Sequence, residues 1–212
     1  EIMPSLVGSE MCIRDRYIID AEEDAEVLIG TTVNSKEELE NQINQDNLLE
    51  SLKRVKVQPG EFYFIPAGTI HSIGSGITVY ETMQSSDITY RLYDYNRQRE
   101  NSSSLDVDKA LDVIQYSQEL PSIVPENEII ENHKCSHIVS NDFFTMVKWE
   151  VSGTLNYMKP REFCLVSVLN GDGQIIIDGE IFKIQKGSNF VLTSEDLDSV
   201  FEGDFTLIIS YI

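Results

Sequence analysis

The sequence has few cysteines and few basic residues. Its three cysteines form neither a Cys-x-x-Cys pair nor the Cys/His spacing of a zinc knuckle, so a disulfide framework is a poor interpretation. Free thiols in a reducing cytoplasm are expected instead. The 16 lysines and arginines stand against 36 aspartates and glutamates, a formal net charge of −20. Nucleic acids and anionic membrane surfaces repel such a chain, so neither is expected as a partner.

Long apolar runs are also missing. No run reaches the roughly 18 residues of a membrane-spanning helix, and the first residues lack the basic-then-apolar order of a signal peptide. We therefore expect a cytoplasmic protein. Apolar residues make up 41% of the chain, enough for a buried core in one or two small domains. An anionic substrate would need a local cluster of arginine or lysine, held against the overall negative charge.

Residues 1–16 have no hydrophobic periodicity and do not lead into the strand predicted after them. Residues 6–16, LVGSEMCIRDR, resemble a translated transposon adapter of the kind used to prepare sequencing libraries. We therefore expect residues 1–16 to be non-native and the natural sequence to start near Tyr17. The alternative is an unusual natural N-terminus.

From Tyr17 on, short apolar and β-branched segments are separated by turn residues. The segments YIID (17–20) and AEVLIG (25–30) predict a hairpin around an acidic turn. Two helical insertions are expected, over 34–53 with Asn34 or Ser35 as its cap and over 105–116. Short strands are expected at 62–65, 77–83, 89–93 and 143–151, among others. Many short strands at this spacing predict a mainly β protein built as a sandwich or barrel.

An internal repeat divides the chain. Residues 55–65, VKVQPGEFYFI, align with residues 182–192, FKIQKGSNFVL, keeping Lys, Gln, Gly and the apolar alternation. The alternative is a chance likeness of two strand–turn–strand units. The repeat predicts two jelly-roll modules. Residues 17–120 are expected to be the C-terminal part of the first module and residues 129–212 the second, joined by a proline-containing linker at 121–128.

The strongest motif is GEFYFIPAGTIH at 60–71. Its skeleton places Gly60 at a tight turn, Pro66 at a strand end, Gly68 at a bend and His71 at the start of the next strand. This pattern resembles the second conserved motif of the cupin family, so the predicted fold is two cupin-type jelly-roll modules with short helical insertions. A neutral imidazole in a barrel mouth is a ready ligand for a divalent metal. The alternative is a core or surface histidine that follows a turn.

The second copy of the repeat lacks this chemistry. The positions of Pro66, Gly68 and His71 correspond there to Thr193, Glu195 and Asp198. The second module therefore reads as a degenerate cupin that serves packing or closure of the site. His133 and His137 lie outside both motifs and are interpreted as linker or surface histidines.

Residues 81–97, ETMQSSDITYRLYDYNR, resemble the type I mannose-6-phosphate isomerases in their short bacterial form, and the likeness runs from Tyr17 to Ile212. It implies a zinc-dependent interconversion of mannose 6-phosphate and fructose 6-phosphate through a cis-enediol(ate), with a phosphorylated hexose as substrate. It also implies that His71 is a metal ligand and Arg91 the active-site arginine. Glu81 and Asp87 match acidic positions that could place or relay protons, although either could instead be structural.

The chain departs from the family before Tyr17. The resemblance implies a Gln-x-His pair and a Glu as further zinc ligands upstream of that strand, where residues 1–16 now stand. One imidazole does not hold zinc, which needs about three protein ligands. We therefore expect an inactive chain in this form. The alternative function is a non-catalytic cupin that binds or senses a sugar.

Overall fold

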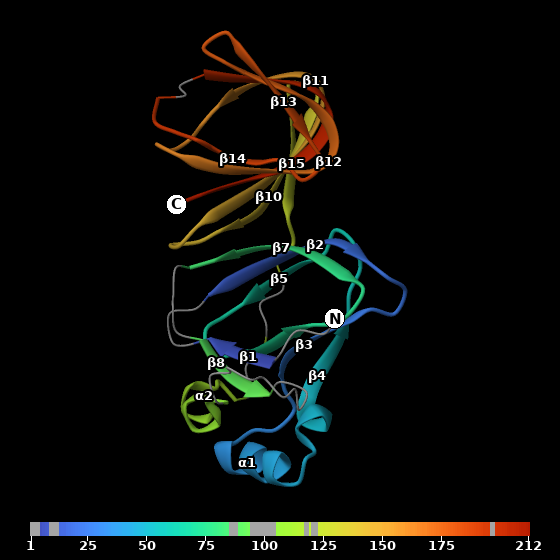
Figure 1. Ribbon diagram of the computed structural model, residues 1–212, viewed down its shortest axis with the longest axis vertical. Coiled ribbons are helices and arrows are strands. Elements are labelled where there is room, and N and C mark those ends of the chain that lie inside the picture. Colours follow the sequence, from blue (N-terminus) through green and yellow to red (C-terminus); the bar gives the residue numbers. More distant parts are fainter. Residues whose placement is uncertain are drawn as a thin grey trace, which may run out of the picture. The chain divides into compact units, whose positions relative to one another are not determined.

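The computed structural model describes residues 5–8, 13–84, 89–93, 105–116, 119, 123–195 and 198–212. The chain divides into two compact units, Glu1–Ser122 and Ile123–Ile212 (Figure 1). The boundary falls inside the segment predicted as a linker, although strand β9 (Glu126–Ile130) already begins there. Among the described residues, no helix is long and apolar enough to cross a membrane. Strands dominate both units, which confirms the mainly β prediction.

The first unit contains two antiparallel sheets, with strand orders β4-β3-β6-β1-β8 and β5-β2-β7. The strands are β1 (Ser5–Gly8), β2 (Arg14–Ala21), β3 (Glu26–Thr31), β4 (Leu52–Lys56), β5 (Phe62–Ile65), β6 (Ile70–Ile73), β7 (Ile77–Met83) and β8 (Thr89–Tyr93). The predicted hairpin of 17–20 with 25–30 is wrong, because β2 and β3 lie in different sheets. The acidic turn between them carries the chain from one sheet to the other.

Residues 1–16 were not expected to lead into the next strand, and here the structure differs. Residues 14–16 are continuous with β2, and β1 pairs with both β6 and β8. Strand pairing uses backbone groups that every non-proline residue carries, so it does not depend on these side chains.

The five-stranded sheet is a middle layer that is buried on both faces. On β3, Leu28 packs with the helices, while Val27 and Ile29 face the three-stranded sheet together with Ile18. The helical elements α1 (Lys36–Asn44), the 3-10 turn η1 (Leu48–Ser51) and α2 (Val107–Val113) lie on the side away from the three-stranded sheet (Figure 1). Ser35 caps α1 by accepting a hydrogen bond from the Glu38 N–H at 3.2 Å.

The second unit is one antiparallel sheet of order β13-β12-β15-β11-β10-β9, with β14 beside β12, and its strands curve around a common interior (Figure 1). The remaining strands are β10 (His133–Ser140), β11 (Thr145–Met158), β12 (Cys164–Ile177), β13 (Glu180–Gln185), β14 (Asn189–Leu192) and β15 (Asp198–Tyr211). Its core holds an aromatic series in which ring centroids lie 5.9 Å apart for Tyr157 and Phe201 and 6.1 Å apart for Phe201 and Phe205.

Glycines allow the three long strands of this unit to approach closely. Gly203 on β15 lies opposite both Gly153 on β11 and Gly173 on β12. A Cβ on Gly203 would stand 2.6 Å from the Asp172 carbonyl oxygen, and one on Gly173 would stand 2.3 Å from that of Glu202. Side chains are therefore excluded at Gly203 and Gly173, whereas Gly153 has open space around it.

The two copies of the sequence repeat have the same local structure. Gly60 and Gly187 both adopt a positive φ, +93° and +87°, in the turn that precedes β5 and β14. These two strands occupy equivalent positions of the alignment. The assignment of both units as complete cupin modules stays a prediction.

Candidate functional site

The turn that contains Pro66 and Gly68 places His71 near the start of β6, as the sequence predicted. Thr69 donates its N–H to the Pro66 carbonyl at 3.3 Å, which closes the turn between β5 and β6. Gly68 has φ +74°, and a Cβ there would lie 2.5 Å from the Val113 carbonyl oxygen at the end of α2. Only glycine fits this bend, and His71 follows it as the second residue of β6.

His71 is buried, with 1% of its surface exposed. Its Nδ1 lies 2.8 Å from the Thr69 carbonyl oxygen, so Nδ1 carries the hydrogen and donates. Nε2 has no hydrogen-bond partner among the described residues. Burial, with a contribution from the nearby Arg16 cation, lowers the pKa of His71 to about 3. The ring is therefore neutral and presents an available lone pair, the form in which histidine binds metals.

The neighbours of His71 are two buried arginines on β2. Arg14 Nη1 donates to Glu81 Oε1 at 2.9 Å, and Arg16 Nε donates to Glu81 Oε2 at 2.6 Å. Arg14 also reaches the Thr89 hydroxyl at 3.4 Å. Burial lowers the pKa of Arg16, which the Glu81 carboxylate opposes. Two guanidinium groups share one carboxylate, so this cluster carries an excess of positive charge beside His71.

This environment does not fit zinc. Among the described residues, no group of three His, Cys, Asp or Glu side chains close enough to hold a metal includes His71. The Glu81 carboxylate is already bound by Arg14 and Arg16. A dication at Nε2 would also be repelled by the net positive charge of this cluster, since Arg16 and Arg14 already help to lower the pKa of His71. His71 offers one good ligand in surroundings that disfavour the ion.

Arg91 lies on the same sheet face as His71. Leu6 of β1 is the Cα partner of both His71 on β6 and Arg91 on β8, so the two residues occupy one row, separated by two strand spacings of about 5 Å each. Opposed residues of a sheet project to the same face. Arg91 also has interaction partners in the fold. Asp87 lies outside the described residues.

A surface hollow of about 340 Å³ in the first unit does not lead to His71. Leu28 and Ser72 contribute to its lining and are cross-strand partners on β3 and β6. Successive strand residues face opposite sides, so Ser72 and His71 point away from each other.

The second unit contains a cluster that sequence reasoning missed. Glu128, Cys135 and His137 bring their ligand atoms within 4.8 Å of one another.

The interpretation of His133 as a linker or surface residue is wrong, because His133 is buried on β10. Its Nε2 donates to the Thr154 carbonyl at 3.0 Å, and its Nδ1 accepts from the Ser152 N–H at 3.3 Å.

Comparisons with known proteins agree on one family. Residues 134–212 match the family described as "Mannose-6-phosphate isomerase, cupin domain". The crystal structure of the mannose 6-phosphate isomerase from Bacillus subtilis superposes with a TM-score of 0.93 at 31% identity, covering 100% of this chain and 72% of that one. The chain belongs to the mannose-6-phosphate isomerase family.

Curated members of the family show the same relationship. Mannose-6-phosphate isomerase ManA of Bacillus subtilis is 37% identical over 203 residues, which are 92% of this chain and 63% of the relative. The mannose-6-phosphate isomerase of Streptococcus mutans is 34% identical over 197 residues, 92% of this chain and 62% of the relative. The chain thus spans somewhat less than two thirds of the length of these relatives. The resemblance drawn from residues 81–97 is confirmed.

Proposed function

We propose that this chain is part of an aldose–ketose isomerase that interconverts mannose 6-phosphate and fructose 6-phosphate. The observation that carries the proposal is the buried His71, whose Nδ1 is held by Thr69 and whose Nε2 is available on the sheet face shared with Arg91. The names of the similar proteins support the reaction. A cytoplasmic location is part of the proposal, because Cys135 and Cys164 are free thiols.

The reaction moves a proton between C1 and C2 of the sugar through a cis-enediol(ate). The Arg91 guanidinium is suited to stabilise the enediolate charge or to bind the phosphate, because it is a fixed, planar cation. Glu81 is the candidate to place or relay the proton, with Asp87 as a second candidate. In this chain Glu81 is bound by both Arg14 and Arg16, so it is not free to accept a proton.

We further propose that residues 1–16 are not native to the fold. Four buried polar atoms there have no hydrogen-bond partner among the residues that the structure describes: Arg14 Nε, both carboxylate oxygens of Asp15 and Arg16 Nη1. Native interiors rarely leave such groups unsatisfied, because each costs about 1–3 kcal/mol and more when charged. The family resemblance implies a zinc ion held with His71, yet Arg14 and Arg16 disfavour it. No catalytic step through a metal is therefore assigned to this chain, which is expected to be inactive.

The proposal is tested by replacing residues 1–16 with the upstream sequence of the natural gene. The chain that carries residues 1–16 should form no fructose 6-phosphate from mannose 6-phosphate with added Zn²⁺. The restored chain should catalyse this conversion. His71→Ala in the restored chain should abolish turnover while circular dichroism shows an intact fold. An inactive restored chain, or one indifferent to His71→Ala, would defeat the proposal. Binding of mannose 6-phosphate without turnover would favour the sugar-binding alternative.

Arg91 has a matched control in the same sheet. In the restored chain Arg91→Ala should lower kcat by at least ~10²-fold if the guanidinium stabilises charge in the transition state. Arg54→Ala removes an exposed guanidinium from β4 that pairs with Glu26 at 3.4 Å, and it should leave kcat unchanged. Equal kinetics for the two variants would show that Arg91 is peripheral.

A further inference from the structure

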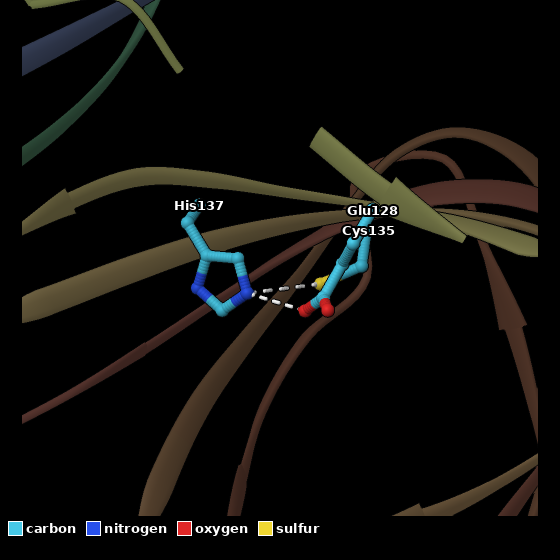
Figure 2. A group of neighbouring side chains, drawn as sticks. All are labelled: Glu128, Cys135 and His137. Carbon is cyan, nitrogen blue, oxygen red and sulfur yellow. Dashed lines mark hydrogen bonds and ion pairs between the residues drawn. The ribbon is translucent and has the colours of Figure 1, made fainter. Parts of the chain in front are cut away.

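Three side chains of different chemistry meet on β9 and β10, at one edge of the sheet of the second unit. His137 Nε2 lies 2.6 Å from Glu128 Oε1 and 3.8 Å from Cys135 Sγ (Figure 2). Imidazole, thiolate and carboxylate are the three ligand types that Zn²⁺ and related transition metals use most. None of these residues takes part in the site around His71.

A tight hairpin fixes the three residues. β9 and β10 are joined at Glu131 and Asn132, both with a positive φ of 49° and 72°, as expected for the mirror-image turns that connect short hairpins. The register places Cys135 opposite Glu128, and His137 is two residues further along β10. These positions face the same side of the pleated sheet. The cluster is therefore built by the backbone and does not depend on long flexible side chains alone.

Cys135 is buried, unlike the other two residues of the cluster. Its side chain is 1% exposed, whereas those of Glu128 and His137 are about half exposed, at 49% and 48%. Burial, together with the neighbouring Glu128 carboxylate, raises the pKa of the Cys135 thiol to about 12. The thiol is protonated in the absence of a cation, and a metal ion must displace that proton to bind.

We propose that Glu128, Cys135 and His137 form a binding site for a divalent transition metal of the Zn²⁺ or Co²⁺ type, distinct from the site at His71. Tetrahedral zinc with ordinary bond lengths requires S···N and N···O separations of about 3.6 and 3.3 Å. The S···N distance of 3.8 Å already meets this requirement. The His137–Glu128 hydrogen bond at 2.6 Å must open by roughly 0.7 Å, which half-exposed side chains permit.

Binding exchanges one proton for one metal–sulfur bond. The Cys135 S–H bond breaks, the proton leaves to solvent and the thiolate bonds to the metal. The hydrogen that His137 Nε2 shares with Glu128 Oε1 is lost to solvent while Nδ1 takes one up, so Nε2 and Oε1 both become free to bind the metal, with no redox change and no further net proton release. Water completes the coordination on the exposed side. The ion ties the edge strand β9 to β10, so it stabilises an edge of the sheet.

Cobalt is the probe of choice, because a thiolate bound to Co²⁺ gives a charge-transfer absorption that a carboxylate or imidazole does not. The full chain, reduced and free of metal, is titrated with Co²⁺ at neutral pH. We expect this absorption to saturate at one ion per chain, to bleach on adding Zn²⁺, and to accompany release of a proton. A rise in Tm should follow metal loading.

Ligand variants and matched controls decide the assignment. Cys135→Ser should abolish the absorption, and His137→Ala and Glu128→Gln should each weaken binding at least ~10-fold. Cys164→Ser removes the other described buried thiol, and Glu126→Gln removes the carboxylate opposite His137 in the register. Both controls should bind cobalt as the parent does.

The proposal fails if no thiolate absorption develops at one equivalent, if it survives in Cys135→Ser, or if neither His137→Ala nor Glu128→Gln weakens binding. The two half-exposed positions keep the test decisive even where Cys135→Ser does not fold. His71→Ala should leave the cobalt signal unchanged. The result is therefore independent of whether the isomerase proposal holds.

Discussion

Replacing the buried carboxyl group of Asp15 by an amide should stabilise the folded chain at neutral pH. Asp15 is 0% exposed, and neither of its carboxylate oxygens has a hydrogen-bond partner in the part of the chain that the structure describes. Burial raises its pKa from the ordinary 3.8 to about 8. The carboxyl group therefore stays protonated in the fold at pH values where the unfolded chain has released the proton.

The magnitude follows from proton linkage. Between pH 3.8 and 8 the folded state holds one proton more than the unfolded state, so the free energy of unfolding falls by about 1.4 kcal/mol for each pH unit. The stability that the raised pKa provides is complete below pH 3.8 and is lost as the pH rises towards 8. From pH 4 to pH 7 the loss is roughly 4 kcal/mol, a large part of the stability of a small domain.

Asp15→Asn has no such proton to lose. The variant should match the parent to within about 1 kcal/mol near pH 4.5 and exceed it by roughly 4 kcal/mol near pH 7. Urea denaturation of both proteins between pH 4.5 and 8 measures the difference, in which the other titrating groups cancel. Asp142→Asn makes the same chemical change at an exposed position of the second unit and is the matched control. A pH-independent difference for Asp15→Asn, or a loss of stability at pH 8, would refute a buried, unpaired carboxyl group in β2.

Two further stability predictions concern the two units separately. Gly203→Ala should lower the free energy of unfolding by at least about 2 kcal/mol, because its Cβ would stand 2.6 Å from the Asp172 carbonyl oxygen. Gly153→Ala, with a positive φ of 91° but open space, should lower it by about 1 kcal/mol. Equal losses in urea denaturation would contradict the close contact at Gly203. Ser35→Ala should destabilise the first unit by about 1 kcal/mol through loss of the cap to Glu38, and an unchanged unfolding midpoint would show that the cap is not formed.

Sequence reasoning succeeded for short apolar segments that turn residues separate. The expected strands at 62–65, 77–83 and 89–93 coincide with β5, β7 and β8. The frame around His71 was also readable, because Gly68 and Pro66 fix the backbone locally without help from distant residues.

The missed elements have particular causes. β10 was not predicted because its buried positions include His133 and Ser136, so its apolar pattern is weak. β11 was expected to stop at Val151, but it continues to Met158 through Gly153, which adopts a positive φ of 91° inside the strand and does not end it. The cluster of Glu128 with Cys135 and His137 needs the register across a turn, and spacing along the chain does not reveal it.

The positive charge around the predicted site comes largely from residues 1–16. A phosphorylated substrate must overcome a net charge of −20, and Arg14, Arg16 and Arg91 supply cations on the first unit's strands. Two of these three belong to residues 1–16, and they are also the ones that keep Glu81 occupied. If that segment is foreign, its removal frees the Glu81 carboxylate, lifts the positive excess that opposes a metal at His71, and leaves Arg91 as the cation of this group that can meet the substrate's charge. Arg91→Ala should then lower kcat in the restored enzyme more than this chain suggests, where Arg14 and Arg16 supply further positive charge.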